Sequence, residues 1–255
     1  MVKTLSLVLL SIIAISSCGG GGEDGGPVNP PPPPDASPGG IWFGTASIGA
    51  TVVGLVAETG EFHFLQDDGV QYFGNVETSQ NAFSAEFTGV AEFGTTFADG
   101  STTGTGALTG TLQERNNMSG ESTFTTAFGT DVGSTLTLSY DDLYERDSSL
   151  AAIAGNYRNT TTNAVVNVND NGDLFSQDSV TGCVINGAIE IINPSFNAYR
   201  VQYRFASCLG PYASLNGTVA NGLGTLDNTV SPERAIIGVV NAAAGYAFTG
   251  VFPRT

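Results

Sequence analysis

The residue types that carry most hydrolytic chemistry are scarce in this chain. It has a single histidine, His63, which alternates with Phe62 and Phe64 in a segment typical of a β-strand. We therefore expect its imidazole on the solvent-facing side of that strand. A catalytic base needs a nucleophile and an orienting partner nearby, and no G-x-S-x-G or S-x-x-K motif supplies one. The only lysine is Lys3. These residue types argue against serine- or lysine-based catalysis.

Carboxylates are the one plentiful catalytic residue type, with 24 Asp and Glu residues in the chain. The doublets Asp67-Asp68 and Asp141-Asp142 stand where turns or strand ends are expected, so we favour solvated loop charge for both. A glycosidase needs two carboxylates placed across a cleft. A carboxylate-dependent envelope hydrolase is therefore the alternative function that the sequence leaves open.

One segment, Asn167 to Asp173 (NVNDNGD), is similar to a calcium loop, since oxygen-bearing side chains alternate before a glycine. It lacks the distal bidentate glutamate of such loops. Asn171-Gly172 is also a strong hairpin turn. We predict a β-hairpin here, with calcium as the alternative. We expect no metal site and no cofactor elsewhere in the chain.

Two cysteines follow Cys18, namely Cys183 and Cys208, and we predict that they form a disulfide in an oxidising compartment. A hairpin folded symmetrically about Asn193 to Asn197 places them opposite each other. In that register, apolar residues of one strand would lie opposite polar residues of the other, because the two patterns are shifted by one residue. A bulge at Gly187 would repair this and would leave both cysteines on the outer face. Free thiols or half of a metal site are the alternatives.

The formal net charge is −16. Because phosphate binding needs clustered positive charge, we expect no nucleic-acid partner. The acidity lies mainly before residue 150, and acids and arginines nearly balance after it.

Arg200 and Arg204 lie in this second half on one face of a predicted strand, whose other face carries an apolar stripe from Tyr199 to Phe205. Two outward arginines about 7 Å apart suit an anionic contact, such as a lipid headgroup, an acidic polysaccharide or a partner's carboxylate. Solvated residues that discourage aggregation are the alternative.

The N-terminal segment predicts export. The apolar run from Leu5 to Ile15 is too short to span a bilayer, which takes about twenty residues, and it has the size of a signal-peptide core. The sequence Ile15-Ser16-Ser17-Cys18 resembles the lipobox of Gram-negative bacterial lipoproteins. The resemblance implies a signal peptide over residues 1–17 and lipid on Cys18. An ordinary secretory signal with an incidental cysteine is the alternative.

The residue after Cys18 is Gly19 and not the Asp that favours the inner membrane in such lipoproteins. The resemblance therefore implies the outer membrane, with the leaflet left open. Residues 18–40 are rich in glycine and proline and predict a lipidated tether that is partly polyproline II.

The remainder reads as antiparallel β-structure, because turn residues recur between runs rich in Val, Ile, Thr, Phe and Tyr. Self-comparison aligns Thr51-Val52-Val53 with Ala164-Val165-Val166, and Leu108 to Leu112 with Leu215 to Val219. We infer a tandem duplication of a unit of about 105 residues, which is large enough to bury its own core. We expect two β-barrel or sandwich domains over residues 41–147 and 150–255, the second an internal repeat of the first.

This arrangement looks like poorly characterised envelope lipoproteins and, more distantly, like surface lipoproteins with small eight-stranded barrels. The resemblance implies a non-enzymatic binding or structural role at a membrane, with an envelope polymer or protein as the ligand. It carries no binding residues over to this chain.

Overall fold

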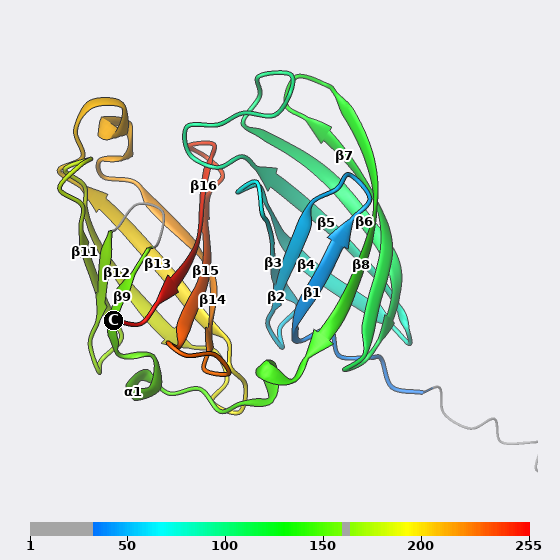
Figure 1. Cartoon of the computed structure of the whole chain (residues 1–255). Helices are drawn as coiled ribbons and strands as arrows, with labels where there is room; N and C mark the ends of the chain where they lie inside the picture. Colours follow the sequence, from blue (N-terminus) through cyan, green and yellow to red (C-terminus); the bar gives the residue numbers. More distant parts are fainter. Residues whose placement is uncertain (1–32, 160–163) are drawn as a thin grey trace, which may run out of the picture. The chain divides into compact units, whose positions relative to one another are not determined.

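The computed structural model describes residues 33–159 and 164–255. The predicted lipid-attachment residue Cys18 and most of the predicted tether lie outside the described residues. Residues 34–255 form one compact unit. They fold into two tandem eight-stranded antiparallel sheets with the character of barrels (Figure 1). The all-β prediction of two tandem antiparallel domains is therefore confirmed, the first as a closed barrel and the second as a barrel-like sheet.

The first barrel is closed. Each strand pairs with the next one along the chain, and β1 also pairs with β8, from Ile41 opposite Asp141 to Ala46 opposite Leu136. Its strands are β1 (Gly40–Ala46), β2 (Thr51–Val56), β3 (Glu61–Gln66), β4 (Gln71–Ser79), β5 (Ala82–Val90), β6 (Thr103–Gln113), β7 (Asn117–Thr126) and β8 (Asp131–Asp141).

Alternation along these strands fills the barrel. Along β5 the buried side chains are Phe83, Ala85 and Phe87, with exposed residues between them. Glycines in the neighbouring strand make room for the rings, since a Cβ added at Gly106 would lie 2.4 Å from the Phe87 ring. The interior is thus built from large aromatic side chains facing small residues.

The second sheet follows the same up-and-down order, from β9 to β16. Among the described residues, its first and last strands are joined by one isolated bridge, Tyr157 to Arg254, and by the Thr255 N–H, which donates to the Asn156 carbonyl (2.9 Å). The strands are β9 (Gly155–Arg158), β10 (Val165–Val168), β11 (Asp173–Gln177), β12 (Val184–Ile191), β13 (Tyr199–Ala206), β14 (Val219–Asp227), β15 (Arg234–Asn241) and β16 (Tyr246–Pro253).

Within residues 33–159 and 164–255, helical structure is limited to three short segments of four to six residues. The 3-10 turn Asp142–Glu145 and the short helix α1 (Leu150–Ile153) link the two barrels, and a second 3-10 turn, Gly210–Leu215, precedes β14. Ser149 caps α1, since its side chain accepts a hydrogen bond from the Ala152 N–H (3.0 Å). Within the described part of the chain, no helix has the length and apolar character needed to cross a membrane.

The predicted Cys183–Cys208 disulfide is present, but the predicted hairpin register is wrong. Ile189 pairs with Val201, and pairing continues through Gly187 without a bulge. The parity changes at Ser207, whose positive φ of 59° turns the following cysteine inward. Both cysteines are consequently buried in the core with the Tyr199 to Phe205 stripe, and not on the outer face.

The end of the predicted tether belongs to the first barrel. Ala36 is buried in its core cluster, and its N–H donates to the Gln80 carbonyl (2.8 Å) in the β4–β5 turn. The Asp35 carboxylate accepts from the Gln80 N–H (2.6 Å), and the Trp42 indole donates to the Pro38 carbonyl (3.3 Å). Residues 35–38 thus form a short strap, held by specific contacts that composition alone does not predict.

The strand succession agrees with the first of the two matches between the halves and not with the second. The segment at Thr51 falls in β2 and its counterpart at Val165 falls in β10, the second strand of each barrel. The final match does not hold, because Leu108 lies within β6 whereas Leu215 ends the 3-10 turn before β14. The duplication itself stays a prediction.

Candidate functional site

Among the described residues, the second barrel holds a cavity that is partly open to solvent, and the first barrel holds a smaller one. The volume of the second-barrel cavity is about 310 Å³, whereas the cavity inside the first barrel measures about 50 Å³. The second-barrel cavity is lined chiefly by Val166, Leu174, Ser176, Cys183, Ile185, Tyr203, Phe205, Tyr212, Leu215, Ile237, Phe248, Thr249 and Phe252, with Glu92, Phe93 and Asp178. A volume of this order is at the lower end of small-molecule sites.

Strand alternation sets these side chains inward. Leu174 and Ser176 are buried along β11 between exposed neighbours, and Tyr203 and Phe205 are buried along β13 in the same way. The disulfide joins Cys183, which immediately precedes β12 and lines the cavity, to Cys208 in the segment after β13. A covalent link at this point fixes the wall by closing a loop, which stabilises the fold by about 3 kcal/mol.

Tyr203 contributes to the wall of the cavity, but its hydroxyl oxygen is buried away from the cavity space. The side chain is only 5% exposed, and its hydroxyl has no hydrogen-bond partner among the described residues. Burial raises the pKa of the phenol, so it stays protonated and remains a donor. Leaving a buried hydroxyl unpaired costs about 1–3 kcal/mol.

The first barrel contributes one wall of the same cavity. Phe93, in the loop after β5, stacks on Tyr212 with ring centroids 5.4 Å apart and on Phe248 at 5.7 Å. The Phe93 N–H donates to the Ala247 carbonyl (2.9 Å), and Glu92 forms a parallel bridge with Ala247. The cavity is therefore complete only when the loop of the first barrel is in place.

Two carboxylates border the cavity. Asp178 is committed to its own turn, because its Oδ1 accepts from the Val180 N–H (2.8 Å) and its Oδ2 accepts from the Thr181 hydroxyl (2.8 Å). Burial, with a smaller contribution from Asp68, raises the pKa of Glu92. No lysine or arginine belongs to the described lining, so the cavity is negative or neutral.

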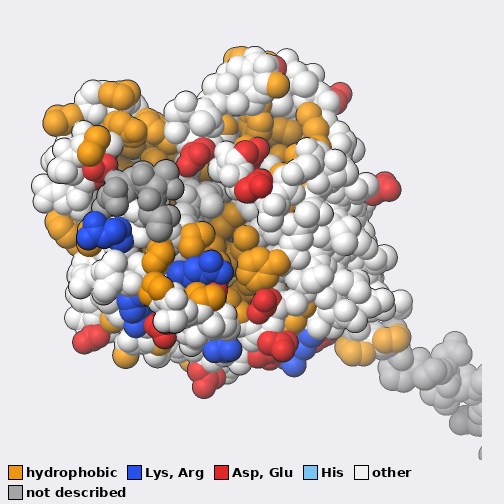
Figure 2. Space-filling model, in the orientation of Figure 1, with side chains coloured by type: hydrophobic (Ala, Val, Ile, Leu, Met, Phe, Trp, Pro, Cys, Tyr) orange, Lys and Arg blue, Asp and Glu red, His pale blue; other side chains and the backbone are white. Residues whose placement is uncertain are grey.

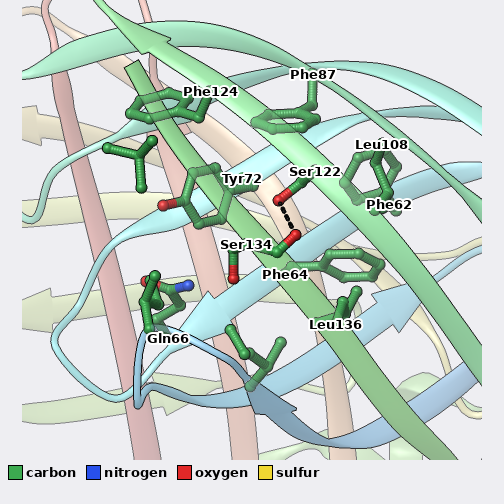
Figure 3. Close-up of a pocket in the computed structure, with 14 residues that line it drawn as sticks. Phe62, Phe64, Gln66, Tyr72, Phe87, Leu108, Ser122, Phe124, Ser134 and Leu136 are labelled. Atoms are coloured by element: carbon green, nitrogen blue, oxygen red, sulfur yellow. Dashed lines mark hydrogen bonds between the residues drawn. The ribbon is translucent and has the colours of Figure 1, made fainter. Parts of the chain in front are cut away.

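The first-barrel cavity is nearly filled by rings (Figure 3). Tyr72 packs edge-on against Phe87 (5.3 Å between centroids) and Phe124 (5.5 Å). The Ser122 hydroxyl donates to the Ser134 carbonyl (3.2 Å). Burial, together with the nearby Asp68, raises the pKa of Tyr72 to about 12. The space that remains inside this barrel is about 50 Å³, much less than in the second barrel.

The sequence-based expectation for His63 is wrong. Its side chain is 3% exposed, stacks on Phe73 (5.6 Å) and lies with Nδ1 3.4 Å from the Gln71 Oε1 atom. Alternation placed it correctly on the outer face of β3. The second barrel covers that face, since the next outward residue, Leu65, shares a core cluster with Leu223 and Ile236. Burial lowers the pKa of His63 to about 4, although the Gln71 hydrogen bond and Glu61 act in the opposite direction.

The structure separates the two arginines that were considered for an anionic contact. Arg200 Nη2 lies 2.6 Å from the Glu61 Oε2 atom of the first barrel, and this ion pair raises the Arg200 pKa. Arg204 is exposed on the same face of β13. An anionic ligand at Arg200 would compete with Glu61. The anion contact stays a prediction, and one of the two arginines proposed for it, Arg200, already forms an ion pair with Glu61.

The other sequence candidates lie in turns or at a strand end. Asp67 and Asp68 follow β3, Asp141 ends β8, and the predicted hairpin joins β10 to β11. In that hairpin the Asn169 Oδ1 atom accepts from the N–H groups of Asn171 (2.9 Å) and Asp173 (3.0 Å). Across residues 33–159 and 164–255, no three His, Cys, Asp or Glu side chains cluster as a metal site would require.

Sequence reasoning placed Tyr203 on the core face but treated it as packing. Whether an inward side chain fills a barrel or borders a cavity depends on the combined sizes of the side chains that surround it. A local sequence pattern does not indicate those sizes, because the side chains come from several strands. Phe93 carried no signal, because its partners lie in the other barrel. No protein-family model matches the chain, and no curated protein matches it.

Proposed function

We propose that this chain is an outer-membrane lipoprotein of the cell envelope, anchored through lipid on Cys18, with a non-enzymatic role: its second barrel binds a small molecule. The single observation that carries the binding proposal is the cavity of about 310 Å³ in the second barrel, with its largely apolar lining. Apolar walls with a few placed polar groups are the usual composition of small-molecule sites.

Binding is favoured over hydrolysis because of the state of the cavity carboxylates. A hydrolase with two carboxylates needs one as acid and one as base or nucleophile. Glu92, with its raised pKa, suits the acid and is the observation that supports the alternative. Asp178 does not suit the second role, because both of its oxygens already accept hydrogen bonds in its turn.

The binding proposal is tested by filling the cavity. Val166 is buried and lines it, whereas its neighbour Val165 is 37% exposed. We expect Val166→Phe to lower the affinity for N-phenyl-1-naphthylamine, an uncharged dye that fluoresces on leaving water, by at least about tenfold, which corresponds to about 1.4 kcal/mol. Val165→Phe, an equal change on the outer face, should leave the affinity unaltered. Equal binding by wild type and Val166→Phe would place the dye elsewhere and contradict the proposal.

The anchor is tested separately by fractionation. Cys18→Ala removes the thiol that would carry the lipid, and three acyl chains would otherwise hold the protein firmly, since stable anchoring takes about two lipid signals. The variant should move from the membrane fraction to the soluble fraction of the envelope. Identical partitioning of wild type and variant would show that Cys18 is not the anchor.

A further inference from the structure

We propose that the second-barrel cavity takes one unbranched alkyl chain, and that the head group of this ligand stays at the mouth of the cavity and carries no negative charge. This inference rests on the proposed binding function. Four properties of the cavity support it, namely its depth, its width, the apolar rim of its mouth and the charge of its lining.

The depth follows from the strands that line the cavity. Three successive inward positions contribute along each of two strands, so the lined length is about 13 Å along either strand. These residues are Leu174, Ser176 and Asp178, along β11 and directly after it, and Phe248, Gly250 and Phe252 along β16.

The cavity is narrow over that depth. The interior of an eight-stranded barrel is just wide enough for side chains or for one small ligand. Spread over about 13 Å, the volume of about 310 Å³ leaves a mean cross-section of about 24 Å². This is little more than the width of one extended hydrocarbon chain, and it is too narrow for a folded or cyclic one.

The volume also sets the length of the chain. A methylene group occupies about the volume of a water molecule, which is roughly 30 Å³, so the cavity accommodates about ten carbons. Aliphatic side chains such as Val166, Ile185 and Ile237 line it. Each methylene group that leaves water for such walls should raise the affinity about fourfold.

The mouth of the cavity has an apolar rim. Thr181 and Tyr212 line the cavity from the β11–β12 and β13–β14 connections, which lie at one end of the barrel. Leu209 links them, since its N–H donates to the Thr181 carbonyl (2.8 Å) and its carbonyl accepts from the Tyr212 N–H (3.2 Å). Val180 and Leu209 are nevertheless 86% and 66% exposed. In Figure 2, hydrophobic side chains gather at the upper end of the second barrel, where these connections lie.

An exposed apolar rim beside an apolar cavity suits a ligand that is longer than the cavity. Carbons beyond about the tenth would emerge at the mouth and lie against Val180 and Leu209, which would shield part of them from water. The polar head group would then remain in water, where its hydrogen bonds are satisfied.

The charge of the lining disfavours an anionic head group. Glu92 and Asp178 belong to the lining, and no arginine or lysine belongs to its described part. A carboxylate or phosphate at the mouth would lose some of its hydration and approach two acids with no compensating cation. A neutral or cationic head group meets no such repulsion.

The shape of the ligand is tested by equilibrium dialysis of 1-decanol and cyclodecanol, a chain and a ring with the same number of carbons. Each association constant is divided by the hexadecane–water partition coefficient of the compound, so that the difference in hydrophobicity cancels. We expect the corrected affinity of wild type for 1-decanol to be at least about tenfold higher, because a ring overpacks a narrow interior. Equal corrected affinities would overturn the inference of a single chain.

The rim is tested with alcohols from 1-hexanol to 1-dodecanol. The association constant should rise about fourfold per methylene group up to about ten carbons and less steeply beyond. Val180→Ser combined with Leu209→Ser should keep the rise up to 1-decanol, which also shows that the variant is folded, and should lose the gain from 1-decanol to 1-dodecanol.

The matched control is Phe128→Ser combined with Val230→Ser. It removes two exposed apolar side chains in the β7–β8 and β14–β15 connections, and neither residue lines the cavity. This variant should keep the whole series of wild-type affinities. Loss of the final gain in both double variants, or in neither, would overturn the role of the rim.

The head group is tested with decylammonium and decanoate, which carry opposite charges on the same chain. Decylammonium should bind at least about tenfold more tightly than decanoate at low ionic strength. Equal affinities would overturn the exclusion of anions. Binding of N-phenyl-1-naphthylamine without binding of any alkyl compound would overturn the ligand class alone. Failure of the dye and of all the alkyl compounds would overturn the proposed binding function itself.

Discussion

Gln71 holds the centre of the contact between the two barrels. Its side chain is fully buried, and the two N–H groups of its amide are shared among three acceptors within hydrogen-bond distance, the carbonyls of Phe248 (2.7 Å) and Val239 (3.3 Å) and the Thr249 hydroxyl (2.8 Å). The amide oxygen is thereby left to accept from His63 Nδ1 at 3.4 Å. The neutral imidazole with its proton on Nδ1 is the form that this network selects.

At the residue scale we predict a pH dependence of stability that His63 controls. Its pKa is about 4 in the folded protein, against an ordinary value of 6.5. Below pH 6.5 the imidazole binds a proton in the unfolded chain but stays neutral in the folded chain. The free energy of unfolding that this group contributes above pH 6.5 is therefore lost as the pH falls towards 4. The loss from this group is at most about 3 kcal/mol.

The measurement is urea unfolding of wild type and His63→Phe at pH 7 and at pH 4.5. The variant keeps a ring against Phe73 but cannot take a proton, so its stability should fall less over this interval. Carboxylates titrate equally in both proteins, and the difference between them isolates the histidine. Parallel pH profiles for the two proteins would mean that His63 is not buried as described.

At the scale of the elements, the alternation of apolar and polar residues predicts the strands and their inward faces. It does not predict which parts of the molecule pack against those strands. The pattern along β5 and β13 identifies the inward residues correctly. Two features escaped it, since Ser207 changes the parity of one strand with a single left-handed residue, and β3 is covered on both faces. Local sequence reports which side chains share a face. It does not report what lies against that face, because that depends on residues about 170 positions away, such as Val239 opposite Gln71.

We predict that Gly238 in β15 is required for the close approach of the barrels. A Cβ added there would lie 2.2 Å from Leu65 Cδ2 and 2.9 Å from the Gln71 Oε1 atom. Gly238→Ala should therefore lower the free energy of unfolding by about 1–3 kcal/mol through overpacking. The control is Gly133→Ala in β8, where the nearest atom to the new Cβ is 4.0 Å away. Equal melting temperatures for the two variants would contradict the described contact.

At the scale of the whole molecule, the two barrels share buried clusters. Leu65 of the first packs with Leu223 and Ile236 of the second, and Val90 with Val240 and Ala247. The barrels are thus stabilised by each other, although each has its own core.

We predict that separate chains covering residues 34–147 and 150–255 each give β-type circular dichroism and cooperative melting, but melt at a lower temperature than the joined protein. The loss of the shared clusters exposes apolar area worth about 25 cal/mol per Å². The second piece, without Phe93, should also bind N-phenyl-1-naphthylamine more weakly than the full chain. Failure of both pieces to fold, with success of the full chain, would show that the barrels form only together.

The up-and-down order of the first barrel has a consequence for the time course of folding. Every pairing except β1 with β8 joins strands that are consecutive in the chain, and such hairpins close within microseconds. The last pairing brings Ile41 to Asp141 and must overcome the closure entropy of the whole intervening segment. During synthesis from the N-terminus, β1 is the first strand of this barrel to emerge, and β8, which closes the barrel, is the last. Until β8 arrives, β1 retains an unpaired edge, and this interval is when the nascent protein is most exposed to aggregation.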